Sequence, residues 1–96
     1  MPVSYFFLKL LEIWRACKEG DLDLVRILIR GGQLVNEQTQ KFKNTPMHIA
    51  SKHGHILIVK FLCSQGAQLN ITNAYGQTAL DISQESVDLI SKQVFD

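Results

Sequence analysis

Residues 45–54 read TPMHIASKHG and residues 55–66 read HILIVKFLCSQG, and these two segments decide the fold. Thr is a favoured helix N-cap, and Pro is favoured in the first helical position because its missing N–H would have no partner there. Thr45 and Pro46 therefore predict the start of a helix, which Gly54 ends.

A second helix is predicted over residues 55–64, closed by Gly66 as a C-terminal glycine. Its apolar residues recur at a spacing that places them on one side of a helix, which predicts a wide buried face. These apolar positions are 56, 58, 59, 61, 62 and 63.

The same pattern occurs earlier in the chain. When the sequence is shifted by 34 residues, residues 14–36 align with residues 48–70 without a gap, and most differences exchange one residue for another of like character. Such a fixed period indicates a repeat architecture. The identical pairs are Ala16/Ala50, Lys18/Lys52, Gly20/Gly54, Val25/Val59, Leu28/Leu62, Gly32/Gly66 and Asn36/Asn70.

A third copy begins near Asn73. A shift of 33 residues aligns Phe42 with Tyr75 and Thr45 with Thr78, so one inserted residue is expected between Asn36 and Thr45. Each copy then consists of two helices, a glycine and an extended stretch. Neither helix can bury its apolar face alone, so the copies must stack to form a core.

The segments Thr45–Ala50, Gly54-His55, Ile58–Leu62 and Gly66–Asn70 closely resemble the ankyrin-repeat pattern. The resemblance implies an all-α solenoid of stacked helix-turn-helix units with hairpin loops. We expect one domain over residues 1–96, with repeats at about residues 8–38, 39–72 and 73–94.

Three departures from this pattern carry expectations of their own. The first copy has Leu11-Glu12-Ile13-Trp14 in place of the Thr-Pro-Met-His motif, as an N-terminal capping repeat does. In the second copy Lys43 takes the place of the hairpin glycine Gly76, which predicts an irregular hairpin. The third copy has no glycine equivalent to Gly54, so its second helix, near residues 87–90, is the least defined element.

Composition excludes several classes of function. The 96 residues carry ten Lys and Arg against nine Asp and Glu, and no basic stripe of the kind that nucleic-acid binders use is present. The apolar opening segment is too short to span a membrane. Cys17 and Cys63 lie in apolar, helical surroundings, so both are expected to be packing residues in a reducing compartment.

No catalytic, cofactor or metal site is expected. His48 lies in the Thr-Pro-x-His motif and His55 follows the turn glycine, and the resemblance implies structural roles for both, whereas His53 is expected to be exposed. Asn36 and Asn70 are expected to satisfy loop backbone groups. The family also has hydroxylated asparagines at this position, and the sequence does not tell whether either residue is modified.

The N-terminal aromatic residues Tyr5, Phe6 and Phe7 contradict the rule that the outer face of an end repeat is polar. Two alternatives stay open. The rings fold back onto the first helix pair, or they dock a partner, a membrane surface, the missing part of a longer chain or a second copy of this chain.

The predicted function is that of a protein-protein interaction module, an adaptor or the recognition part of a larger protein, located in the cytoplasm or nucleus. The alternative is a regulatory or inhibitory subunit that blocks an enzyme surface. The resemblance implies a concave binding face made of hairpin tips and first helices, where Phe42 and Tyr75 either contact the partner or pack on the neighbouring hairpin, and where lysines favour an acidic partner. The predicted partner-binding residues are Lys18, Glu19, Lys41, Phe42, Asn44, Lys52, His53, Ala74, Tyr75, Gln77, Gln84 and Glu85.

Overall fold

The computed structural model describes residues 4–83. Its helices are α1 (Tyr5–Glu19), α2 (Leu22–Leu28), α3 (Pro46–Lys52) and α4 (Ile56–Ser64), and residues 79–83 begin a further helix. No strand occurs within residues 4–83, so the predicted all-α class is confirmed. Gln84, Glu85 and the predicted second helix of the third copy lie outside the described residues.

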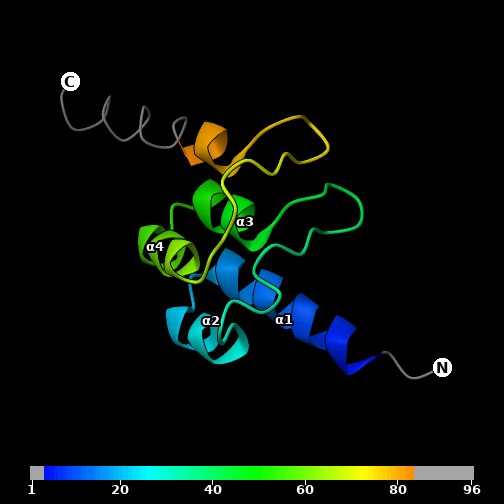
Figure 1. Ribbon diagram of the computed structural model, residues 1–96, viewed down its shortest axis with the longest axis vertical. Coiled ribbons are helices and arrows are strands. Elements are labelled where there is room, and N and C mark those ends of the chain that lie inside the picture. Colours follow the sequence, from blue (N-terminus) through cyan, green and yellow to red (C-terminus); the bar gives the residue numbers. More distant parts are fainter. Residues whose placement is uncertain (1–3, 84–96) are drawn as a thin grey trace.

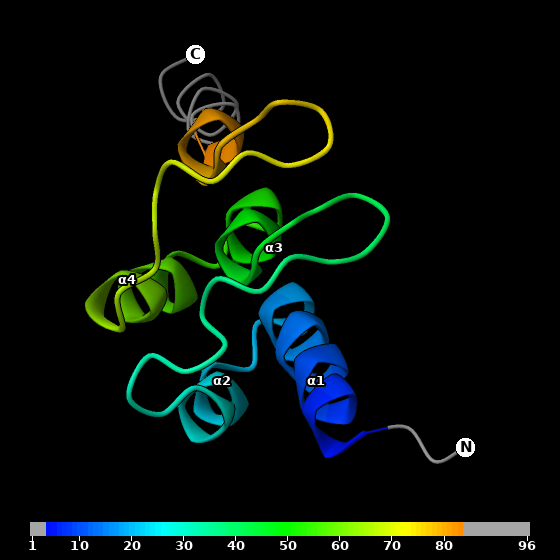
Figure 2. The ribbon, with the colours of Figure 1, turned by 45° about the vertical axis from the view of Figure 1, so that its right-hand side comes forward.

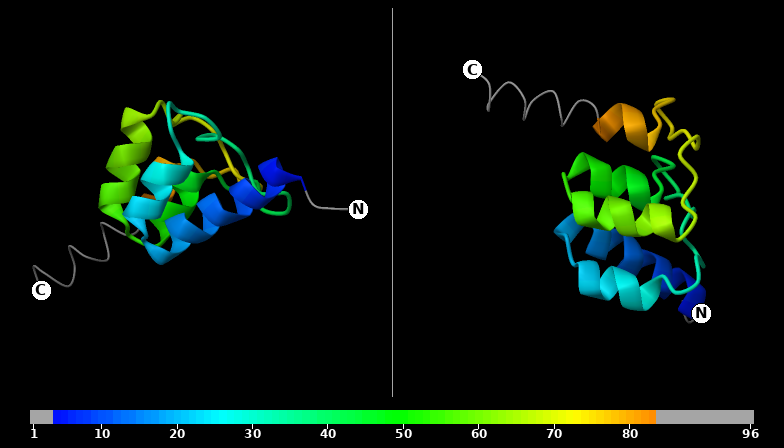
Figure 3. Two further views of the ribbon diagram at one scale, coloured as in Figure 1. Left: turned by 90° about the horizontal axis from the view of Figure 1, so that it is seen from below. Right: turned by 60° about the vertical axis from the view of Figure 1, so that its left-hand side comes forward.

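The helices form two columns (Figure 2). Helices α1 and α3 and residues 79–83 lie one above another in the first column, and α2 and α4 lie in the second. Figure 3 shows the same units as stacked layers with the loops along one side, and Figure 1 shows two hairpin loops projecting on that side. This is the predicted solenoid of stacked helix-turn-helix units.

Local caps explain where the helices begin. Thr45 Oγ1 accepts the backbone N–H of His48 at 3.2 Å, and Pro46 is the first residue of α3, as predicted. The first copy lacks this Thr-Pro signal, so α1 starts earlier, where Ser4 Oγ accepts the N–H of Phe7 at 3.1 Å. The aromatic residues Tyr5, Phe6 and Phe7 therefore form the first turn of α1.

The core lies between the two columns. Helix α1 packs against α2 and α3, and α4 packs against α2 and α3. Leu62 of α4 and Ile13 of α1 are fully buried in one apolar cluster, with Val25 of α2 and Met47 of α3. Because residues from both columns and from adjacent repeats meet there, no repeat holds a core of its own.

The prediction of a wide buried face on α4 is wrong. Only Ile58 and Leu62 are buried, while Ile56 is 58% exposed and Cys63 is also exposed. Val59 and Phe61 are partly buried against the core, so α4 contacts its neighbours along a narrower face than predicted. Cys63 is therefore not a packing residue, whereas Cys17 is fully buried as expected.

The prediction of an irregular hairpin with one inserted residue in the second copy is confirmed by the backbone angle of Lys43 and by its hydrogen bond. Lys43 adopts φ +57°, close to the φ +75° of Gly76, so a side chain occupies a left-handed position that usually favours glycine. The N–H of Lys43 donates to the carbonyl of Thr39, four residues earlier, whereas that of Gly76 donates to the carbonyl of Asn73, three residues earlier. The inserted residue thus lies within the hairpin at residues 39–43.

A hydrogen bond between repeats fixes the turn after α1. The ring Nε2–H of His55 donates to the carbonyl oxygen of Lys18 at 2.9 Å, which confirms a structural role for His55. The ring lies directly over Gly20, where a Cβ atom would come within 2.7 Å of His55 Cε1. Gly20 also has φ +84°. This position therefore requires glycine for two separate reasons.

Asn36 and Asn70 differ in the hydrogen bonding of their side chains. Asn36 Oδ1 accepts the backbone N–H of Gln68 in the following repeat at 2.9 Å, as its predicted role requires. Asn70 is exposed and makes no side-chain hydrogen bond within residues 4–83, so its predicted role is not observed there.

Replacing Leu62 by Ala should lower the free energy of unfolding by about 2–5 kcal/mol, because it leaves a cavity between α4 and its neighbours. Leu57 on the same helix is 66% exposed and provides the matched control, since Leu57→Ala should change stability by less than about 0.5 kcal/mol. Urea unfolding followed by circular dichroism measures both. Equal losses for the two variants would contradict the assigned packing of α4.

Gly20→Ala should destabilise the protein more than Gly54→Ala. Both glycines have positive φ, so both variants bear a cost of about 1 kcal/mol, but a Cβ at Gly54 meets nothing within 4 Å. At Gly20 the new methyl group must displace His55 from the carbonyl of Lys18, at a further cost of about 1 kcal/mol. Thermal unfolding compares the two, and equal melting temperatures would show that the His55 contact is not important.

Candidate protein-binding cleft

A cleft of about 800 Å³ lies between the first helices and the two hairpins. Helix α1 contributes Trp14, Arg15 and Lys18, and α3 contributes His48, Ile49 and Lys52. His53, directly after α3, also lines the cleft. The other lining residues belong to the two hairpins and the third copy: Phe42, Asn44, Asn73, Tyr75, Gln77 and Ile82. The stacked repeats thus form one continuous concave surface from three sequence segments.

Most of the predicted partner-binding residues line this cleft: Lys18, Phe42, Asn44, Lys52, His53, Tyr75 and Gln77. Lys41 lies beside it, with Nζ 5.2 Å from the centre of the Phe42 ring. Ala74 joins the hairpins, since its N–H donates to the carbonyl of Phe42 at 2.8 Å. Glu19 is exposed at the end of α1 and does not line the cleft.

The structure shows one of the two alternatives that the sequence left open for Phe42 and Tyr75, while contact with a partner stays a prediction. Their rings stack on each other with centres 6.0 Å apart and planes 19° apart, so they do pack between neighbouring hairpins. They also remain accessible, with Phe42 42% and Tyr75 70% exposed. A rigid, stacked aromatic pair that still contacts water is suited to bind a partner at little cost in side-chain entropy.

His48 connects the start of α3 to the third copy. Its Nε2 lies 2.8 Å from the carbonyl oxygen of Gln77, which can only accept, so Nε2 carries the proton. Its Nδ1 then accepts from Thr45, whose Oγ1 lies 2.7 Å away. This arrangement confirms the predicted structural role of His48 and leaves neither ring nitrogen free.

A partly buried network around Asn73 fixes the orientation of the hairpin amides. Asn73 Oδ1 accepts the backbone N–H groups of Tyr75 and Gln77, at 2.9 and 3.0 Å. Its Nδ2 therefore donates to Asn44 Oδ1 at 3.1 Å and to Gln77 Oε1 at 3.2 Å. Sequence reasoning placed Asn73 in the hairpin of the third copy but did not predict that it would orient the two neighbouring amides, although an Asn at the start of a tight hairpin was a usable signal.

The positive groups of the cleft are exposed. Arg15 pairs with Glu12 at 2.6 Å, and this is the single ion pair among residues 4–83. Lys18 and Lys52 occupy equivalent positions in adjacent repeats and have no ion-pair partner in that range. Burial, and then the neighbouring Lys52, His55 and Lys18, lower the pKa of His53.

The described residues hold no cluster typical of a metal site, and the one buried thiol is not reactive. No three His, Cys, Asp or Glu side chains within residues 4–83 lie together as metal ligands would. Burial raises the pKa of Cys17 to about 12, so this thiol stays protonated at neutral pH. No helix within the same residues is long and apolar enough to cross a membrane.

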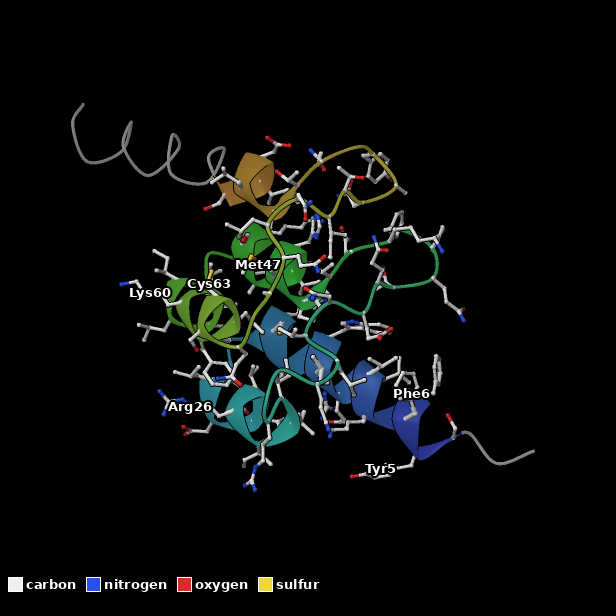
Figure 4. The ribbon with its side chains drawn as sticks, in the orientation of Figure 1. Tyr5, Phe6, Arg26, Met47, Lys60 and Cys63 are labelled. Atoms are coloured by element: carbon white, nitrogen blue, oxygen red, sulfur yellow. The ribbon has the colours of Figure 1, made fainter. Side chains whose placement is uncertain are left out.

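Figure 4 shows the side chains of the described residues. Tyr5 and Phe6 lie at the far end of α1, where they are 80% and 51% exposed, so these two rings do not fold back into the core. Arg26 and Lys60 project on the side of α2 and α4 opposite the hairpins. The guanidinium of Arg26 lies 6.0 Å from the ring centre of Phe61.

Comparison with known proteins agrees with this geometry. The family model for ankyrin repeats in three copies matches residues 13–91. The chain belongs to the ankyrin-repeat family. Ankyrin repeats are protein-protein interaction modules and are generally non-catalytic. The expected family and the broad functional class are therefore confirmed, while the residues that contact a partner stay a prediction.

Three relatives illustrate how the module is used. A probable E3 ubiquitin-protein ligase of Oryza sativa subsp. japonica is 38% identical over 66 residues, which are 68% of this chain and 13% of the relative. A putative ankyrin repeat protein of fowlpox virus is 36% identical over 72 residues, 72% of this chain and 21% of the relative. Protein fem-1 homolog C of Bos taurus is 38% identical over 69 residues, 72% of this chain and 11% of the relative. The chain thus spans a small part of each.

Proposed function

We propose that this ankyrin-repeat chain is not an enzyme and binds a partner protein in the cleft between its hairpins and first helices. The observation that carries the proposal is the exposed Phe42–Tyr75 stack, which two adjacent hairpins hold at the edge of the cleft. Aromatic side chains in such positions supply a large share of binding energy at protein interfaces.

The chain acts as an adaptor or as the recognition part of a larger protein or assembly. The relatives support this proposal because each joins a similar module to a chain several times longer. A cytoplasmic or nuclear location is consistent with the two cysteines, which are both free. If the partner is an enzyme whose activity falls on binding, the chain is instead a regulatory or inhibitory subunit.

The exposed aromatic residues of the first turn of α1 form a second contact surface. Tyr5 and Phe6 project from the end of the stack, and Leu8 and Leu11 on the same helix are 49% and 44% exposed. Apolar surface of this kind usually marks a contact. We propose that this end of α1 docks a partner or a second copy of the chain.

The double variant Phe42→Ala/Tyr75→Ala should lose the proteins that bind the wild-type chain specifically. The matched control, Ile27→Ala/Leu69→Ala, also removes two exposed apolar side chains but leaves the cleft intact, so it should retain the same proteins. Affinity purification with quantitative mass spectrometry compares the three baits. Binding that survives the first variant and is lost in the control would place the interface elsewhere.

The double variant Tyr5→Ser/Phe6→Ser should abolish self-association of the isolated chain while leaving its melting temperature nearly unchanged, because both side chains are exposed and the Ser4 cap is kept. Light scattering and a thermal melt test this. Unchanged association would contradict a role for these rings in self-contact, and a large drop in melting temperature would show that they support the fold.

A further inference from the structure

Several side chains that line the cleft offer hydrogen-bond donors to a ligand. Because Asn73 Nδ2 donates to the side-chain oxygens of Asn44 and Gln77, those two amides must turn their oxygens towards Asn73. Their NH₂ groups then have no acceptor within residues 4–83. Each amide is only partly buried, so both NH₂ groups can reach a ligand in the cleft.

The charged lining residues add further donors. Lys18 of α1 and Lys52 of α3 stand on successive first helices, and no Asp or Glu lines the cleft among the described residues. Both lysines line the same cleft as His53, and, after burial, their charges contribute to lowering the pKa of that ring. An ammonium group can only donate, so a ligand that covers these two exposed side chains must supply acceptors.

Aromatic rings of the hairpins and of α1 form part of the cleft lining. Phe42 and Tyr75 form the stacked pair on the hairpins, and Trp14 is held in place by a hydrogen bond from its Nε1 to the carbonyl of Glu37 at 3.4 Å. The surface that a ligand meets therefore combines aromatic rings with uncompensated donors. A ligand that matches it needs an apolar side chain and several acceptor groups.

We propose that the cleft binds an extended acidic segment of the partner protein, with one bulky apolar side chain on Phe42 and Tyr75 and with carboxylates at Lys18 and Lys52. This inference rests on the proposed function and adds the chemistry of the partner. Carboxylates are acceptor-only, so they complement both the ammonium groups and the amide NH₂ groups.

Other ligand chemistries fit less well. A neutral segment would cover Lys18 and Lys52 without pairing them, and a basic one would add like-charge repulsion. Nucleic acid needs a row of cations along its phosphates, whereas the chain has a formal net charge of only +1. Charge complementarity therefore favours an acidic peptide segment over these alternatives.

A random dodecapeptide display library selected on the immobilised full chain tests the proposal. Enriched peptides should carry Asp or Glu around one bulky apolar residue. Their affinity, measured by fluorescence anisotropy, should fall about tenfold or more for Lys18→Glu/Lys52→Glu, because two favourable charge contacts become repulsive.

The matched control is Arg30→Glu/Lys60→Glu, which makes the same change in net charge at two exposed residues outside the cleft. It should retain affinity within about twofold, since exposed charges at a distance are screened by salt. If both charge variants weaken binding equally, the effect belongs to net charge and the proposed cleft contacts are contradicted.

The remaining outcomes separate this inference from the proposed function. Enriched peptides without acidic residues that still lose binding in Phe42→Ala/Tyr75→Ala would retain the cleft as the binding surface and overturn the acidic preference. If the enriched peptides bind the aromatic and the lysine variants as tightly as the wild-type chain, both this inference and the proposed function are overturned. The same holds if the selection enriches no peptide whose binding depends on the cleft.

Discussion

The two hydrogen bonds of the His48 ring hold the helices and the hairpins in one arrangement. The ring is 1% exposed, so each nitrogen must find a partner within the protein or cost the free energy of a buried unsatisfied group. Nδ1 completes the cap at Thr45, and Nε2–H reaches Gln77 in the next repeat. One side chain thus determines where α3 begins and where the following hairpin lies.

The binding cleft depends on this arrangement. Once Gln77 is held, the hairpin at residues 73–77 lies beside that at residues 39–44, and further bonds join the two. The N–H of Ala74 donates to the carbonyl of Phe42, and Gln38 Nε2 donates to the carbonyls of Lys43 and Thr72 at 2.8 and 3.0 Å. The stack of Phe42 on Tyr75 is therefore a consequence of the hairpin register.

Much of the fold could be predicted because its signals are local. The Thr45 cap, the terminal glycines and the spacing of Leu62 each act within one or two helical turns, so the sequence alone contains them. The ankyrin resemblance supplied the roles of His48 and His55, which act between repeats. The family motif thus carried information that helix periodicity could not.

The remainder depends on three-dimensional context that no local pattern contains. Apolar character alone did not tell which side of α4 faces a neighbour, so Ile56 and Cys63 were wrongly expected to be buried. The donor character of the cleft arises because Asn73 accepts two backbone N–H groups and thereby orients Asn44 and Gln77. The orientation of these two side-chain amides follows only from the three-dimensional structure.

Amide hydrogen exchange in His48→Ala tests the central claim, that His48 positions the hairpin of the third copy. His53→Ala, one turn further on and exposed, serves as the control. In His48→Ala the N–H groups of Ala74 and Gly76 should exchange faster relative to those of α4, and the control should leave this ratio unchanged. Equal acceleration of the hairpin and of α4 would mean that His48 supports only global stability, which would contradict the account.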